Sequence, residues 1–272
     1  MNKWQARVRQ HYDKCVEILG DERRVFGVFL IGSQNYGLAE PTSDVDTKAI
    51  IFPSLMDIVT NARPLNMEMH FDNGEHMTIT DYRLWFEQLQ KGNPNVIEIL
   101  HTDYFVLNSK YNKIWDSLFA IRENISHYNT QATCHAIKGL FYNECKYCFK
   151  STEDKKAIFK QFYYNPKRLM SMMRLTSLLI NYSKYNDTKS ALIIPAADVK
   201  HFLEVKNGLY NLSEAMEIHK NYLQIIEQII EEIDQDKEMQ EKNNENRVVV
   251  KKAMDLLAKQ AFTIFLRGEM DV

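Results

Sequence analysis

Hydrophobic and polar residues follow two different patterns along this chain, and the change falls near residue 108. Before it, short apolar runs bounded by turn residues stand between amphipathic segments, which predicts strands mixed with helices. After it, apolar residues recur every three or four positions, which predicts helices, and only "ALII" at 191–194 looks extended. We therefore expect an α+β fold, with a mixed sheet and flanking helices in residues 1–108 and a mostly helical domain in residues 109–272.

Local signals place the elements of the N-terminal part. The run "RVFGVFLIGS" is strongly apolar and ends in Gly32-Ser33, which predicts a buried central strand. Polar residues 72–74 stand between two short alternating runs, which is a hairpin signal. The other elements expected here are helices at 2–19, 54–61, 81–91 and 94–100, and strands at 45–52 and 103–108.

The second part carries helical spacing over most of its length. We interpret the polar run "DQDKEMQEKNNENR" at 234–247 as a solvated loop or a frayed helix end. The helices expected around it are 110–124, 129–149, 166–183, 196–206, 213–232 and 247–266.

Composition narrows the class of protein. The 272 residues are 45% hydrophobic and 26% charged, which is typical of a globular chain with a sizeable core. With 34 basic and 36 acidic residues, no bulk charge favours nucleic acid or anionic lipid as a partner. No run approaches the roughly 20 apolar residues of a membrane span. Together with only four cysteines, this predicts a cytoplasmic protein without a disulfide framework.

Two aspartates stand inside an apolar run and suggest a cation site. In a strand, Asp44 and Asp46 project to one face while Val45 projects to the other. Two adjacent carboxylates repel each other unless a cation lies between them. Oxygen ligands of this kind favour Mg²⁺ or Mn²⁺, which complete their shells with water and substrate phosphates.

A candidate phosphate site precedes the aspartates. The Gly32-Ser33 pair follows a buried strand and opens a turn, where backbone N–H groups and the Ser33 hydroxyl could hold a triphosphate. Ser43 stands beside the aspartates and could donate to the same anion. Neither Gly-Ser nor Asp-x-Asp is specific alone, but their ordered combination between two apolar strands indicates function.

This combination resembles the nucleotidyltransferase motif of the DNA polymerase β superfamily: a glycine-serine turn, a short helix, then aspartate-x-aspartate on the next strand. It is more closely similar to the predicted-nucleotidyltransferase branch of bacteria and phages, which is associated with RNA repair. The likeness covers about residues 25–180. The segments that carry it are Gly32–Leu38, Ser43–Asp46, Gly92–Leu100 and Asn165–Leu175.

The resemblance implies a polymerase-β-like sheet domain and a helical domain that closes over the nucleotide. Gly32 and Ser33 would bind phosphates, and Asp44 and Asp46 would bind Mg²⁺ (or Mn²⁺) with a third carboxylate. The implied reaction transfers a nucleoside monophosphate from a nucleoside triphosphate, ATP among them, and releases pyrophosphate. Three acceptors stay open: an RNA end, a protein hydroxyl and a small molecule.

The resemblance places the third carboxylate on a neighbouring strand, and the hairpin after Leu65 is the natural location. We favour Glu75 as the third catalytic and metal-binding residue, because its segment "NGEHMTITDYR" is similar to phage relatives. Glu68 has the parity of a carboxylate leaving a buried strand. Asp72 is typical of a turn and Asp81 of a helix N-cap. Some relatives carry an aspartate where this chain has His76 or Thr78.

Further candidates lie in the helical segments. Lys167 and Arg174 are two turns apart on one helix, so both could reach a triphosphate. Glu98 is either a packing residue or a functional or supporting residue of the site, and the family that the chain resembles keeps a glutamate at this position. Cys145 and Cys148 form a lone Cys-x-x-Cys, which is weak evidence for zinc.

Three functions follow from these residues. The first is a metal-dependent nucleotidyltransferase. The second is a catalytically silent nucleotide-binding or antitoxin-like partner protein, because without a third carboxylate the metal cluster is incomplete. The third is a nucleic-acid binding module built on basic and aromatic residues of the helical part. Its residues would be Lys160, Tyr163, Tyr164, Lys167 and Arg168.

Overall fold

The computed structural model describes residues 2–151, 155–184 and 187–270. The chain divides into two compact units, and each is considered by itself. Unit 1 consists of Met1–Asn35, Ala39–Tyr128 and Glu245–Val272, and unit 2 of Tyr36–Leu38 and Asn129–Asn244.

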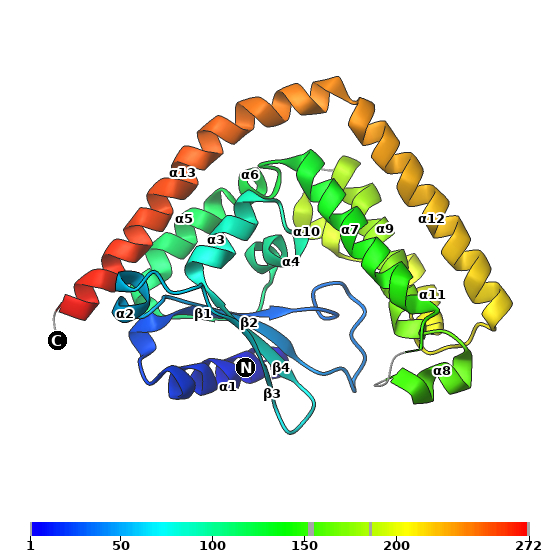
Figure 1. The fold of residues 1–272 in the computed structure, drawn as a ribbon, viewed down its shortest axis with the longest axis horizontal. Helices are drawn as coiled ribbons and strands as arrows, with labels where there is room; N and C mark the ends of the chain where they lie inside the picture. The colour runs from blue at the N-terminus through cyan, green and yellow to red at the C-terminus, as the bar shows by residue number, and fades with distance from the viewer. Residues whose placement is uncertain (1, 152–154, 185–186, 271–272) are drawn as a thin grey trace. The chain divides into compact units, whose positions relative to one another are not determined.

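Unit 1 is built on a five-stranded mixed sheet with the strand order β3-β4-β2-β1-β5 (Figure 1). β2, the central strand, runs parallel to its neighbour β4, and every other neighbouring pair is antiparallel. The bounds are β1 Val25–Ile31, β2 Asp46–Ile51, β3 Asn66–His70, β4 His76–Asp81 and β5 Phe105–Leu107. The α+β class expected from the sequence is therefore confirmed.

One face of the sheet packs against the first helix, α1 (Lys3–Leu19), and is called the α1 face (Figure 1). Val28 and Ala49 lie on it together with the buried Val8 and Tyr12 of α1. The helix begins and ends as its sequence predicts: the Asn2 side chain accepts the N–H of Trp4, and Gly20 adopts the left-handed conformation at the C-terminus.

The opposite face, called the α3 face, is covered by α3 (Tyr82–Gln90), α5 (Asn112–Ala120) and the second half of α13 (Lys237–Met270). Phe29 and Ile50 of the sheet pack there in an aromatic-rich core. The remaining elements of unit 1 are the 3-10 helices η1 Glu22–Arg24, η2 Glu98–His101 and η3 Ser109–Tyr111, and the helices α2 Leu55–Val59, α4 Pro94–Ile97 and α6 Arg122–Ser126.

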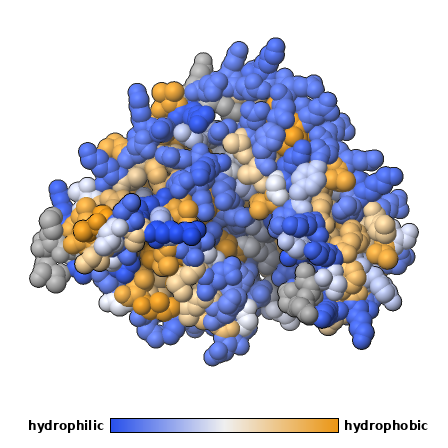
Figure 2. All heavy atoms as spheres, viewed as in Figure 1, coloured by the Kyte–Doolittle hydropathy of each residue, from blue (hydrophilic) through white to orange (hydrophobic). Residues whose placement is uncertain are grey.

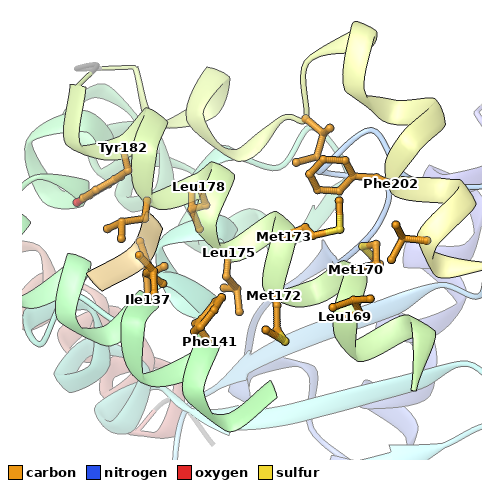
Figure 3. Close-up of a cluster of buried hydrophobic side chains, with 14 of the residues drawn as sticks. Ile137, Phe141, Leu169, Met170, Met172, Met173, Leu175, Leu178, Tyr182 and Phe202 are labelled. Atoms are coloured by element: carbon orange, nitrogen blue, oxygen red, sulfur yellow. The ribbon is translucent and has the colours of Figure 1, made fainter. Parts of the chain in front are cut away.

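Unit 2 is helical. Its most extensive packing between helices joins α7 (Thr130–Cys148) to α9 (Pro166–Lys184). The helices α11 (Ala196–Lys206) and α12 (Leu212–Gln235) also pack on α9. Figure 3 shows their core, in which Phe141 of α7 lies beside Leu175 and Met172 of α9, and Met173 of α9 lies beside Phe202 of α11. The short helices α8 Lys156–Phe162 and α10 Thr188–Leu192 complete the unit.

Two local expectations are wrong. The run "ALII" is not a strand, because Ala191 and Leu192 end α10 with both side chains buried, although Ile193 after them has an extended backbone. A short apolar run fits a buried helix end as well as a strand. The polar run at 234–247 is helical except at Asp236, between α12 and α13. It is rich in Glu, Lys, Gln and Met, which are strong helix formers.

The two units also differ from a division after residue 108. Residues 109–128 and 245–272 belong to unit 1, because Trp115, Met254 and Phe265 are buried in the core of the α3 face. Spacing along the chain marks these segments as helices but does not say which core they join.

On the face seen in Figure 2, hydrophilic side chains cover most of the surface, with apolar groups between them. No helix in the described part of the chain is long and apolar enough to cross a membrane.

Candidate functional site

The Gly32-Ser33 turn lies directly beside Asp46. β1 pairs with β2 so that Ile31 stands opposite Asp46, and Gly32 begins the turn one residue later. Gly32 has φ +97°, a conformation that side-chain-bearing residues rarely adopt. A Cβ atom at Gly32 would lie 3.7 Å from Asp46 Oδ2. Strand pairing therefore brings the predicted phosphate turn and one predicted metal ligand together.

A buried glutamate accepts hydrogen bonds from this turn. Glu98, at the start of η2, is 3% exposed, and its Oε1 accepts the Gly32 N–H at 2.7 Å and Asn35 Nδ2 at 2.7 Å. The hydroxyl of Thr102 donates to Asn35 Oδ1 at 2.9 Å. Glu98 therefore fixes the backbone of the turn through two hydrogen bonds.

The contact with Glu98 changes which donors of the turn are available to a phosphate. The Gly32 N–H points back to the carboxylate, so it does not face outward. Within the described ranges, the N–H groups of Ser33 and Gln34 donate to no protein acceptor. These two donors, with the Ser33 hydroxyl, form the part of the turn that could meet an anion.

A lysine lies on the same sheet face as Asp46. Lys48 is two residues further along β2, so both side chains leave the sheet on the α3 face. Burial lowers the pKa of the Lys48 amine, and the nearby Glu98 carboxylate offsets part of that shift. The sequence analysis missed Lys48, although its two-residue spacing from Asp46 is a signal that strand parity could have supplied.

Asp44 and Asp46 have different surroundings. Val45 is 1% exposed in the core of the α1 face, so its two acidic neighbours turn away from that core. Asp44 is exposed and precedes β2, and its backbone carbonyl accepts from Gln34 Nε2 at 2.6 Å. Asp46 is half-buried at the first position of the strand. The Oγ of Ser43 accepts the N–H of Glu40 at 2.9 Å, which closes a local turn ahead of the pair.

His76 is the residue of β4 that stands in register with Asp46. Its Nδ1 lies 2.8 Å from Asp46 Oδ1, and the two side chains are 34% and 27% exposed. The next position in this row is His70 of β3, whose ring centroid is 6.0 Å from that of His76. Parallel pairing of β2 and β4 therefore puts an imidazole at the strand position beside Asp46.

Glu75, the favoured third carboxylate, lies in a different cluster on the α1 face. Arg7 donates to both its oxygens, and His11 Nε2 lies 3.1 Å from Oε2. His11 Nδ1 lies 2.8 Å from the hydroxyl of the fully buried Thr47. Because Thr47 and Asp46 are consecutive in β2, their side chains leave the sheet on opposite faces. The structure therefore does not bring Glu75 and Asp46 together.

The charges in the Glu75 cluster compensate one another. Burial alone would raise the pKa of Glu75, but hydrogen bonds from Arg7, Asn73 and His11 outweigh it and lower that pKa. Burial also lowers the pKa of His11, against the opposing effect of Glu75. Phe71 stacks on the His11 ring at a centroid distance of 4.1 Å. Such a closed network is a structural feature.

The other candidates for a third carboxylate stand apart from the site in different ways. Glu68 pairs with Thr78, which pairs with Lys48, so Glu68 shares the sheet face of Asp46 but lies on the edge strand with its side chain 66% exposed. Asp81 caps α3 and binds Arg83, as an N-cap residue should. Within residues 2–151, 155–184 and 187–270, no group of three or more His, Cys, Asp or Glu side chains is placed to hold a metal ion.

Lys167 and Arg174 belong to unit 2, on the same side of α9. The Arg174 guanidinium lies 4.1 Å from the ring centroid of Tyr36, and the Tyr36 carbonyl accepts the N–H of Ile194 at 2.9 Å. The second half of the "GSQNYGL" motif is thus packed in unit 2. Lys167 is exposed.

Two residues proposed for a nucleic-acid module are paired or buried within unit 2. Arg168 forms an ion pair with Glu144 at 3.0 Å, and Tyr164 is fully buried. Cys145 and Cys148 are free thiols that pack in the core of unit 2.

The comparisons with known proteins identify no family for this chain. No family model matches it, and no curated protein is significantly similar to it.

Proposed function

We propose that this protein is a metal-dependent nucleotidyltransferase with a polymerase-β-like site. The observation that carries the proposal is the juxtaposition of the Gly32 turn with Asp46, at the adjoining ends of two paired strands, where a Cβ atom on Gly32 would lie 3.7 Å from Asp46 Oδ2. An anion-binding turn beside a carboxylate is the arrangement needed to hold a metal–triphosphate complex. The sequence resemblance, which rests on the same residues, favours the same function.

In this proposal each residue has a defined task. Asp44 and Asp46 hold Mg²⁺ or Mn²⁺, which when bound neutralises the triphosphate and lowers the pKa of an acceptor hydroxyl. The free N–H groups of Ser33 and Gln34 bind phosphate oxygens. Glu98 fixes the turn through the Gly32 N–H. The acceptor attacks the α-phosphorus, and pyrophosphate leaves.

Asp44 and Asp46 can bind one metal ion only if their two carboxylates point toward the same position. Asp46 is held in place by β2, whereas Asp44 is in the exposed segment before it. Substrate phosphates therefore supply part of the metal shell, as is usual for Mg²⁺ sites.

The test is transfer of label from each of the four α-³²P-labelled nucleoside triphosphates, with Mg²⁺ or Mn²⁺, to RNA ends, protein and small-molecule hydroxyls. Full-length protein is compared with Asp46→Asn and with Asp116→Asn, a matched control on an exposed position of α5. Transfer that survives in the control and is lost in Asp46→Asn supports the proposal. Equal transfer by all three proteins refutes it.

A second candidate is a catalytically silent nucleotide-binding or antitoxin-like partner protein that retains the fold. It is favoured by Glu75, whose carboxylate is bound by Arg7 and His11 and faces away from Asp46. Equilibrium dialysis with radiolabelled ATP, GTP, CTP and UTP separates the two. Binding without transfer to any acceptor would support the silent protein.

A further inference from the structure

The strand register fixes an oxygen and a nitrogen donor beside each other. β2 and β4 pair in parallel over six residues, and Asp46 and His76 are the first pair of that ladder. Both side chains therefore leave the same face from a hydrogen-bonded backbone at the centre of the sheet. Neither side chain depends on a loop for its position.

The separation of these donors matches two ligands of one ion. His76 Nδ1 lies 2.8 Å from Asp46 Oδ1. Two adjacent ligands of an octahedral ion, each about 2.1 Å from the metal, are about 3.0 Å apart. A cation can therefore bind both atoms with little movement of either side chain.

The second oxygen of Asp46 faces the proposed phosphate turn. Oδ2 is the atom that lies 3.7 Å from the position of a Gly32 Cβ. The carboxylate thus has His76 at one oxygen and the turn at the other, so an ion held at this pair lies near the N–H donors of Ser33 and Gln34.

We propose that His76 is a metal ligand, which together with Asp46 forms a mixed nitrogen–oxygen site that prefers Mn²⁺ and Co²⁺ to Mg²⁺. This inference rests on the proposed function for the role of the metal. Imidazole is a good ligand for transition-metal ions, whereas Mg²⁺ prefers carboxylates, phosphates and water. Because the residue beside Asp46 in the sheet is an imidazole and not a carboxylate, it changes the metal that the site selects.

His70 provides a matched control. It lies in the same row of the sheet, but on the edge strand β3 and two strands from Asp46. Its side chain is 73% exposed and its Nε2 lies 4.0 Å from Glu68 Oε2. Removing it leaves the Asp46–His76 pair intact.

The experiment measures binding of Mn²⁺, Co²⁺ and Mg²⁺ alone to the full chain by calorimetry, without nucleotide. We expect Mn²⁺ to bind at least about tenfold more tightly than Mg²⁺, following the general order of affinities. His76→Ala should weaken Mn²⁺ binding by at least about tenfold. His76→Asp, which restores oxygen at this position, should bring the Mn²⁺ and Mg²⁺ affinities closer together, and His70→Ala should match the unsubstituted protein.

Pulsed electron paramagnetic resonance of bound Mn²⁺ identifies the ligand directly. A coupling to ¹⁴N in the unsubstituted protein and in His70→Ala, absent from His76→Asp, is the expected result. Circular dichroism of each variant checks that the fold is retained.

Two results would overturn the inference: no binding of Mn²⁺ to the unsubstituted protein, or binding without nitrogen coupling that His76→Ala leaves unchanged. Either would mean that His76 does not bind an ion at Asp46. The proposed function fails separately, when Asp46→Asn transfers nucleotide as well as the unsubstituted protein does.

Discussion

Acidic residues on the two faces of the central sheet have contrasting surroundings. On the α1 face, Glu75 is bound by Arg7 and by His11, which also contacts Thr47. On the α3 face, Asp46 lies between an imidazole and a glycine turn with free N–H donors. A carboxylate whose charge is compensated by protein side chains stabilises the fold, whereas a carboxylate beside unpaired N–H donors is placed to bind a ligand.

The largest effect expected from this contrast is on catalysis at Asp46. Asp46→Asn keeps the shape of the side chain but removes its charge, so we expect nucleotide transfer to fall by at least about a thousandfold, as for loss of a group that stabilises developing charge. Its thermal unfolding should change little, because the residue is half-buried at a strand end. Label transfer and calorimetry measure the two quantities. A variant that unfolds readily would contradict the assignment of Asp46 to function.

Glu75→Gln should give the reverse pattern. The substitution leaves Arg7 and His11 facing a neutral amide, so the free energy of unfolding should fall by about 2 kcal/mol, while transfer by the folded protein should persist. Urea denaturation and label transfer below the unfolding transition check both parts. Loss of transfer in a stable Glu75→Gln protein would restore Glu75 as the third catalytic carboxylate.

An intermediate effect is expected at Glu98, which acts through the turn. Glu98→Gln retains an acceptor oxygen but loses the charge, so the Gly32 N–H is held more weakly and transfer should fall about tenfold. Because the turn binds phosphates in our proposal, most of the loss should be in KM for the nucleoside triphosphate. Steady-state kinetics separates KM from kcat, and an unchanged KM would argue against a positioning role.

The smallest effect concerns pH and again belongs to the α1 face. Burial lowers the pKa of His11 below its usual 6.5, so the unfolded chain takes up a proton before the folded protein does. Stability should therefore fall as the pH drops below about 6.5. The lowered pKa of Glu75 acts in the same direction at more acid pH, below its usual 4.5.

The His11→Gln variant isolates the contribution of this histidine. Between pH 7 and pH 5, the free energy of unfolding should fall for the unsubstituted protein by up to about 1 kcal/mol more than for His11→Gln, because the variant lacks the titrating group. Denaturation at a series of pH values measures the difference. Parallel curves for the two proteins would show that another group dominates this range.

Local sequence was sufficient for most helices, strands and turns of unit 1. Asn2, Gly20 and Ser54 end or begin helices because their capping interactions involve residues close by in the chain. The hairpin with its turn at 72–74 forms for the same reason. The "ALII" segment could not be assigned, because burial by distant residues decides between its alternatives.

By itself, the sequence determined that a glycine turn and an Asp-x-Asp strand follow one another, and that a mixed sheet precedes long helices. Only tertiary structure decided which side chains meet across the sheet. The parallel pairing of β2 with β4 places His76 beside Asp46, while α1 draws Glu75 to the other face. A shift of one residue in strand register exchanges the faces of every side chain, and register depends on packing between segments far apart in the chain.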